Sequence, residues 1–244
     1  MTPGTPSNGR RRRFIVLILL LLIAGAVAAF FFSGEDAPPP SEALPESSSE
    51  PVATIETLPL PPAQDIANHY GGLSANTEQQ SLVTRVGNNV VTRSDAARMG
   101  GASFRFYVLA DQNRINVFAL PDGTIFITTL LLNHLKTEGQ LAAMLAHEIG
   151  HITARHQPNW LATGVVTYTR EQEILADANG VRYMSQAGYD PRAFIAVLMK
   201  LRDIHTTVPV EFFSSHPSPV NRVPRIEFAI KQQFPEGVPE ALSD

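Results

Sequence analysis

The chain has no cysteine among its 244 residues. Disulfide bonds, a cysteine nucleophile and a lipid-modified cysteine are therefore excluded, although the lack of cysteine is compatible with any compartment. An excess of positive charge is also missing, because 19 basic and 23 acidic residues give a net charge of −4. Nucleic-acid-binding domains carry clustered basic residues, so nucleic acid is not an expected partner.

Charged residues are absent from residues 14–32, which read FIVLILLLLIAGAVAAFFF. As a helix this run would be about 28 Å long, close to the hydrocarbon thickness of a bilayer. Four arginines precede it at residues 10–13, and Glu35 and Asp36 follow it, so the positive-inside rule places residues 1–13 in the cytoplasm. The sequence predicts a single-pass transmembrane anchor in a bacterial inner membrane, with the following chain in the periplasm.

A cleaved signal peptide is the alternative interpretation of the same run. Residues 26–28, Ala-Val-Ala, resemble a small-residue cleavage site, and cleavage there would release the domain into the periplasm. The apolar run continues through three phenylalanines at residues 30–32, which do not suit a cleavage site, so we favour the retained anchor.

Residues 33–62 are rich in proline, serine and glutamate and include Pro38-Pro39-Pro40. Such a segment buries too little apolar surface to offset its loss of conformational entropy, so we expect a disordered linker. The folded domain is therefore expected over residues 63–244.

Local patterns within residues 63–244 predict helices and a few strands. Pro121-Asp122-Gly123 is a strong turn signal between two β-rich runs, so these runs should form a hairpin. Capping patterns and apolar periodicity indicate the helices. Strands are expected at 104–109, 115–120 and 124–128, and helices at 77–91, 137–156, 169–183 and 190–204. The predicted fold class is α+β: a helical body with a small antiparallel sheet, and the helix at 137–156 packed under that sheet.

The helix predicted over residues 137–156 carries an H-E-x-x-H motif, His147-Glu148-Ile149-Gly150-His151. Side chains four residues apart share one face of a helix, so His147 and His151 can direct their imidazoles at one point. A zinc ion binds such a pair, and Glu148 beside it can take the proton of a bound water. The motif predicts one zinc ion per chain, with Glu148 as general base.

A third ligand is expected from the next predicted helix, where Glu173 and Asp177 share one face. Glu173 would complete a His-His-Glu set and leave a fourth position for water. Asp177 would hold the tautomer of a ligating histidine by accepting its other ring N–H. A solvated acidic helix face is the alternative for these two residues, since Glu171 lies on the same helix.

The remaining candidates are a histidine and several residues without a clear partner. His216, in SSHPSP, would stabilise the oxyanion, bind zinc as a fourth ligand, or be an ordinary loop histidine. Arg222 would anchor that loop or place a charge near the site, and Arg155 should pair with a carboxylate. His156 lies about 100° from the face of the motif histidines, so it is not expected to be a ligand. Surface or packing positions are expected for His69, His134, His205 and Trp160.

Four ordered motifs carry a resemblance to a known family: HEIGH, then E-x-x-A-D at 173–177, then AGYDP at 187–191, then Ser215-His216-Pro217 with Arg222. Together they resemble the HtpX-like and CAAX-prenyl-protease-like gluzincin metallopeptidases, family 48 of the metallopeptidases, especially its soluble BepA-like and mitochondrial branch. The resemblance covers residues 82–226. It implies a zincin-like endopeptidase fold with zinc ligands His147, His151 and Glu173, and with Glu148 as the base.

The resemblance extends to Asn116 and the segment LPDGTIFITTLLL, which look like the family's edge strand and following helix. We expect Asn116, Val117, Phe118 and Ala119 to form an exposed edge to which a substrate peptide adds as a strand. An inner strand is the alternative. HtpX-like members have several membrane spans and BepA-like members a helical-repeat domain, whereas only residues 14–32 qualify as a span here, so only the catalytic set carries over.

These patterns predict a membrane-anchored zinc metalloendopeptidase that hydrolyses peptide bonds in misfolded or misassembled envelope proteins. Its expected partners are protein or peptide substrates and the membrane. The alternative is a zinc-stabilised quality-control or assembly factor that binds envelope proteins and whose proteolysis is latent. The intact Glu148 favours the enzyme, because a binding module needs no base at that position.

Overall fold

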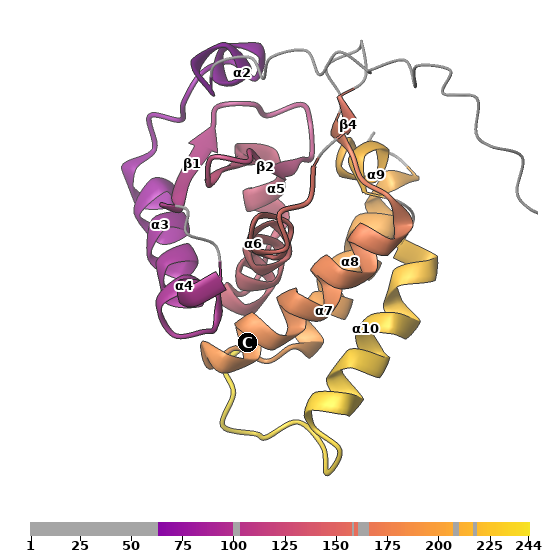
Figure 1. The fold of residues 1–244 in the computed structure, drawn as a ribbon. Helices are drawn as coiled ribbons and strands as arrows, with labels where there is room; N and C mark the ends of the chain where they lie inside the picture. Colours follow the sequence, from indigo (N-terminus) through magenta and orange to yellow (C-terminus); the bar gives the residue numbers. More distant parts are fainter. Residues whose placement is uncertain (1–62, 100–102, 158, 161–165, 207–209, 217–218) are drawn as a thin grey trace, which may run out of the picture. The chain divides into compact units, whose positions relative to one another are not determined.

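The computed structural model describes residues 63–99, 103–157, 159–160, 166–206, 210–216 and 219–244, all of them within one compact unit (Figure 1). The predicted anchor at 14–32 and the predicted linker at 33–62 lie outside the described residues. Across the described ranges, no helix combines the length and the apolar character that crossing a membrane requires.

The described chain is mostly helical, with one small sheet and one short hairpin. The helices are α2 (Ala63–His69), α3 (Thr77–Thr92), α4 (Ala96–Met99), α5 (Thr129–His134), α6 (Glu138–Thr153), α7 (Arg170–Gln186), α8 (Arg192–His205), α9 (Phe212–Ser215) and α10 (Pro219–Gln233). The strands are β1 (Arg105–Leu109), β2 (Val117–Ala119), β3 (Thr124–Thr128), β4 (Asn159–Trp160) and β5 (Val166–Thr167). Figure 1 shows α6 at the centre of this arrangement, in contact with β2, α3, α7 and α8.

The main sheet is mixed, so the prediction of an antiparallel sheet is wrong. Its order is β1-β3-β2. The predicted hairpin is present, because β2 and β3 pair in antiparallel orientation around the turn at Gly123, whose φ is 93°. β1 pairs with β3 in parallel orientation. The chain reverses direction after β1 and again after β2, and β3 then lies between β1 and β2. Hydrophobic periodicity reports the faces of a strand and not its neighbours, so this order was not accessible from the pattern.

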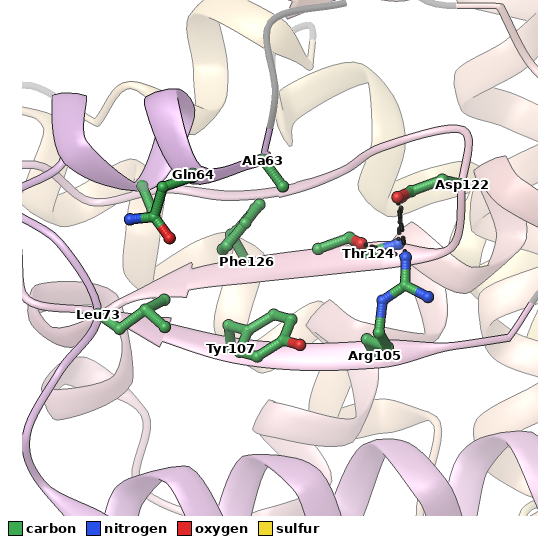
Figure 2. Close-up of a pocket in the computed structure, with 9 residues that line it drawn as sticks. Ala63, Gln64, Leu73, Arg105, Tyr107, Asp122, Thr124 and Phe126 are labelled. Atoms are coloured by element: carbon green, nitrogen blue, oxygen red, sulfur yellow. Dashed lines mark hydrogen bonds and ion pairs between the residues drawn. The ribbon is translucent and has the colours of Figure 1, made fainter.

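The two faces of the sheet bury different clusters, as strand alternation requires. Val117, Ala119, Ile125 and Ile127 pack into the large core that contains α3 and α6. Phe118 and Phe126 face the opposite way, toward α2. On this second face lies a cavity of about 210 Å³, in which Tyr107 and Phe126 line the wall and Arg105 donates hydrogen bonds to Asp122 and Thr124 (Figure 2). The cavity is therefore on the side of the sheet away from α6.

The main-chain groups at the outer edge of β1 are hydrogen-bonded by the side chain of Gln80, as they would be by a neighbouring strand. The Nε2 amide of Gln80 donates to the carbonyl oxygen of Phe106 at 2.7 Å, and its Oε1 accepts from the N–H of Val108 at 3.0 Å. The carbonyl of Val108 accepts from Ser74 N–H at 2.8 Å. This edge of the sheet has no room for an added strand.

The other edge of the sheet is β2, and the main-chain groups on its outer side do not bond to β3. Thr128 N–H donates to the Asn116 carbonyl, and Leu120 N–H donates to the Thr124 carbonyl. In an antiparallel pair these bonds alternate, so the N–H and C=O groups of Val117 and Ala119 point away from β3. The expectation that this strand is exposed is wrong, because Val117, Phe118 and Ala119 are all buried, main chain included. Both faces of the strand are covered, one by α6 and one by α2.

The helix that carries the H-E-x-x-H motif is α6, and it is shorter than predicted. Its N-cap is Thr137, whose hydroxyl accepts from Gln140 N–H at 3.2 Å. The side chain of Gln140 accepts from Lys136 N–H, so only half of the expected capping box forms. The helix ends at Thr153, and Arg155 adopts the left-handed conformation with φ 54°. The chain therefore leaves the helical axis before His156.

Candidate metal centre

The two helices that supply the predicted ligands touch through their backbones at two glycines. A Cβ atom on Gly150 of α6 would lie 2.8 Å from the carbonyl oxygen of Ala176 on α7. A Cβ atom on Gly180 of α7 would lie 3.3 Å from the backbone nitrogen of His147. Distances this short exclude a side chain at Gly150 without movement of α7. This close approach brings the acidic face of α7 against the histidines of α6.

Four buried side chains offer one ligand atom each within 4.8 Å of one another: His147, His151, Glu173 and His216. Nε2 of His147 and Nε2 of His151 are 3.1 Å apart, and Nε2 of His151 is 3.3 Å from Oε1 of Glu173. The structure thus brings together the three residues that the sequence proposed as ligands. Their exposed fractions are 0%, 1% and 3%, so the alternative of a solvated acidic face is wrong for Glu173.

His216, the residue that follows α9, joins the same group. Its Nδ1 atom lies 2.8 Å from Oε1 of Glu173 and 3.1 Å from Nε2 of His147, and its ring stacks on Phe212. The residue is fully buried, which is incompatible with an ordinary loop histidine. Two imidazoles, a carboxylate and a third imidazole are together a complete tetrahedral donor set of the type that zinc prefers.

The α9 segment is fixed to the start of β2 by a buried polar network. Phe212 N–H donates to the Ile115 carbonyl at 3.1 Å. The side-chain amide of Asn116 donates to Glu211 at 3.0 Å and to the Tyr70 hydroxyl at 3.2 Å, and Tyr70 in turn donates to Glu211. Asn116 precedes β2, and its side chain holds the neighbouring segment in place.

Asp177 and Arg222 form the layer behind the ligands. Oδ1 of Asp177 lies 3.0 Å from Nδ1 of His147, which leaves Nε2 of that ring directed at the other donors. Arg222 donates to Asp177 through Nε at 3.0 Å and through a terminal nitrogen at 2.5 Å. Another terminal nitrogen of Arg222 lies 3.6 Å from Oε2 of Glu173. Arg222 is therefore a buried charge at the site and the link between α10 and α7.

Two further residues contact the motif histidine His151 and were not predicted to do so. Nδ1 of His156 lies 2.9 Å from Nδ1 of His151, because the chain turns back after the helix ends. His156 lies outside the four-donor group, as expected. The reason differs from the predicted one, because α6 ends at Thr153 and His156 is not on the helix. Tyr168, just before α7, stacks on His151 with ring centroids 3.7 Å apart and an angle of 29°. No pattern in the sequence distinguishes this tyrosine.

The charge states of His147, His151 and Glu173 suit a cation, whereas the burial of His216 is outweighed by the negative charges of Glu173 and Glu148, which raise its pKa. Burial and the neighbouring charge of Arg222 lower the pKa of His147 to about 4. Burial also lowers the pKa of His151 well below its usual value. Burial alone would raise the pKa of Glu173, but His216, His151 and His147 outweigh it and hold that pKa well below its usual value. Neutral imidazoles and an ionised carboxylate are the forms that bind a metal.

Glu148 is fully buried beside this group, with neither carboxylate oxygen hydrogen-bonded to a described residue. Burial raises its pKa to about 7, the negative charge of Glu173 adds to the rise, and the positive charges of His216 and Arg222 oppose it. The backbone of Ala119, in β2, also opposes the rise. A base with a pKa near 7 can both accept and return a proton at neutral pH.

Buried polar atoms in the group test whether a metal fits. Oε2 of Glu173, Nε2 of His216 and both oxygens of Glu148 have no hydrogen-bond partner among the described residues. Buried polar atoms without partners are unfavourable, and a bound cation with its water would satisfy them. The residues present therefore fit a metal ion.

The other predicted contacts give a mixed result. Arg155 is exposed and forms no ion pair with any described residue, so the expected carboxylate pair is wrong. His69, His134 and His205 lie outside the donor group. His205 accepts a hydrogen bond from Val210 N–H at 3.1 Å. The side chain of Trp160 lies outside the described part of the structure.

An H-E-x-x-H helix that meets a glutamate from the following helix is the centre of a gluzincin-type metallopeptidase fold. The family model of peptidase family M48 matches residues 77–166 and 159–229. These matches cover more than half of the chain, which therefore belongs to peptidase family M48.

Several characterised proteins are similar to this chain. The beta-barrel assembly-enhancing protease of Yersinia pestis is 26% identical over 182 residues, which cover 58% of this chain and 37% of that protein. The mitochondrial metalloendopeptidase OMA1 of Arabidopsis thaliana is 30% identical over 131 residues, 43% of this chain and 27% of that protein. OMA1 of Schizosaccharomyces pombe is 28% identical over 197 residues, 67% of this chain and 57% of that protein. The chain spans less than half the length of the first two relatives.

The buried pair of Arg222 and Asp177 predicts a large loss of stability when the arginine is replaced. Arg222→Met keeps the length of the side chain and leaves Asp177 and Glu173 as buried charges without compensation. We expect the free energy of unfolding in urea to fall by about 3–5 kcal/mol. Arg225→Met, on the same helix but without an ion pair to a described residue, is the matched control and should change it by about 0.5 kcal/mol or less. Equal effects of the two substitutions would contradict the assignment.

Proposed function

We propose that this chain is a zinc metalloendopeptidase in which His147, His151 and Glu173 bind the metal and Glu148 is the general base. The observation that carries the proposal is the convergence of three buried donors with a buried carboxylate that lacks a hydrogen-bond partner among the described residues. Histidine nitrogens and a carboxylate oxygen are the donors of catalytic zinc sites. Membership of family M48 supports the same assignment.

The protein residues have separate tasks in this reaction. Zinc, when bound, polarises the scissile carbonyl and lowers the pKa of a bound water. Glu148 takes the proton of the attacking water and passes it to the amine that leaves, for which its pKa of about 7 is suited. Asp177 keeps Nε2 of His147 directed at the metal by accepting from Nδ1.

His216 has two roles open to it in this proposal. In the geometry observed, Nδ1 of His216 lies among the other three donors and fills the fourth position of the set. A set closed by four protein donors leaves no position for water, so hydrolysis would require this imidazole to withdraw. Nε2 of the same ring lies 3.5 Å from Oε1 of Glu148, where it would stabilise an oxyanion.

Substrate recognition is proposed to use the open edge of β2. A peptide bond can be hydrolysed in chains of any sequence if the substrate is held by its backbone, and strand addition does so through main-chain hydrogen bonds. The N–H and C=O groups of Val117 and Ala119 do not bond to β3, and β2 contacts α6, the helix that carries Glu148. The edge of β1 is closed by Gln80, which leaves β2 as the edge available for pairing.

The proposed activity is tested by measuring the zinc content and the casein cleavage of the wild type and of Glu148→Gln. We expect one zinc per chain in both proteins and a turnover at least about 10²-fold lower in the variant, because the base is lost and the ligands are not. Glu171→Gln, an exposed residue of α7, is the matched control and should cleave normally. Near-normal cleavage by Glu148→Gln would favour the alternative of a zinc-stabilised binding factor. Zinc retained in a His147/His151 double variant would refute the ligand set.

Proline at the open positions of β2 tests the edge. Val117→Pro and Ala119→Pro remove N–H groups that do not bond to β3, so we expect loss of cleavage with zinc content and melting temperature kept. Phe118→Pro removes an N–H that bonds to β3 and should instead lower the melting temperature. Normal cleavage by either of the first two variants, or unfolding of both, would contradict substrate pairing at this edge.

The substrate class and location are proposed from the sequence and from the relatives. One relative is named a beta-barrel assembly-enhancing protease, which supports misassembled envelope proteins as substrates. Residues 10–13 and 14–32 support an inner-membrane anchor with the domain in the periplasm. Release of the domain after signal cleavage and a factor that only binds envelope proteins are the alternatives.

A reporter fused after Asp244 tests this topology. An alkaline phosphatase fusion, which requires an oxidising compartment, should be active, and a matched fluorescent reporter that folds only in the cytoplasm should not. Sequencing of the mature N-terminus distinguishes the anchor from a signal peptide, since an N-terminus near Ala29 would show cleavage. The opposite pattern of reporter activity would contradict the periplasmic location.

A further inference from the structure

Tyr168 is placed against the metal centre by its position immediately before α7. It is 7% exposed, and its ring is stacked on His151 at 3.7 Å and is near-parallel to His216 at 5.4 Å, with an angle of 29° in both cases. The cap of α7 fixes this position, because Thr169 and Gln172 exchange two hydrogen bonds at the next residue. The ring is therefore held over the centre by a regular helix start.

The hydroxyl group of Tyr168 has no hydrogen-bond partner within the described part of the chain. The ring of Tyr168 lies against His151 and His216. Nε2 of His216 is 3.5 Å from Oε1 of the base Glu148, so the tyrosine borders the space between the ligands and the base. A buried tyrosine hydroxyl normally finds a partner, and one without a partner in a catalytic centre is available to a ligand.

The chemistry at this position calls for a donor. When the oxygen of water bonds to the scissile carbon, Glu148 accepts the proton and the carbonyl oxygen becomes an oxyanion. When the carbon–nitrogen bond breaks, the carbonyl re-forms and Glu148 returns the proton to the amine. The carboxylates near the centre repel the developing negative charge, so a neutral donor that keeps its own proton adds to the stabilisation that a bound zinc supplies.

We propose that Tyr168 is a further catalytic residue, whose hydroxyl donates a hydrogen bond to the oxyanion of the scissile carbonyl. The proposal rests on the metalloendopeptidase function proposed above. The phenol proton is not transferred, so the hydrogen bond changes neither the proton count nor the bonds of the reaction. Its contribution is specific to the tetrahedral state, because the ground-state carbonyl oxygen carries less charge.

Tyr168→Phe tests this role, because it removes the hydroxyl and keeps the stack on His151. With the zinc-loaded full chain and a casein-derived fluorogenic peptide, we expect kcat to fall about 10²-fold while KM changes by less than about two-fold. Zinc content should stay at that of the wild type. Tyr107→Phe, on the opposite face of the sheet (Figure 2), is the matched control and should leave kcat unchanged.

A binding measurement supplies a readout that does not depend on turnover. In the Glu148→Gln background, addition of Tyr168→Phe should weaken the binding of a phosphinic peptide, which resembles the tetrahedral state, by about 10-fold or more. Binding of the uncleaved parent peptide should stay the same. Calorimetry measures both affinities.

The outcomes separate this proposal from the one on which it rests. If the wild-type chain holds zinc and cleaves casein, the metalloendopeptidase function stands and the tyrosine variant decides this inference alone. A kcat within about three-fold of the wild type, a change confined to KM, or a loss of activity that follows a loss of zinc would each overturn it. If the wild type holds zinc but never cleaves, the proposed function fails. Equal affinities of Glu148→Gln with and without Tyr168→Phe for the phosphinic peptide would then overturn this inference as well.

Discussion

The contact between α6 and α7 is the constraint on which the rest of the centre depends. Gly150 stands inside the H-E-x-x-H motif, and the backbone of Ala176 occupies the space that a side chain there would need. Gly180 makes the reciprocal approach to His147. Because two helix backbones meet at both points, the separation between the histidines and Glu173 is set by rigid elements rather than by flexible side chains. Preorganised ligands of this kind lose little entropy when they bind a metal.

The contact between α6 and α7 buries several ionisable groups. The free-energy cost of burying their charges has to be offset by other charges within the fold. Glu148, Glu173 and Asp177 are all buried, and Arg222 faces two of them. Buried ion pairs add little net stability, but loss of one partner is strongly destabilising. The oxygens of Glu148 and Glu173 without hydrogen-bond partners among the described residues fit a further positive charge, such as a metal ion. The arrangement is explained by function rather than by stability.

Residue spacing within the helices predicted which side chains share a face, but it did not predict the order of the strands in the sheet. The H-E-x-x-H spacing and the acidic pair on the next helix predicted a cluster that the structure does bring together, because helical periodicity alone decides which side chains share a face. The mixed sheet was missed, since alternation does not specify strand order. His156 and Tyr168 were missed because both contacts arise where helices end or begin, and element boundaries are the least certain part of a sequence-based prediction. The sequence left Arg222 undecided, because its partners come from elements far apart in the chain.

The two edges of the sheet differ in how their main-chain groups are satisfied. An unpaired edge is a liability, and the side chain of Gln80 removes it at β1 by bonding the strand as a neighbouring strand would. At β2 the outward main-chain groups do not bond to β3, and the strand as a whole is buried. The network of Asn116, Tyr70 and Glu211 joins the start of this strand to the segment that carries His216. The strand proposed to hold a substrate and the imidazole that fills the fourth donor position are thus joined by one polar network, so a displacement of β2 by a bound peptide would act on the segment that carries His216.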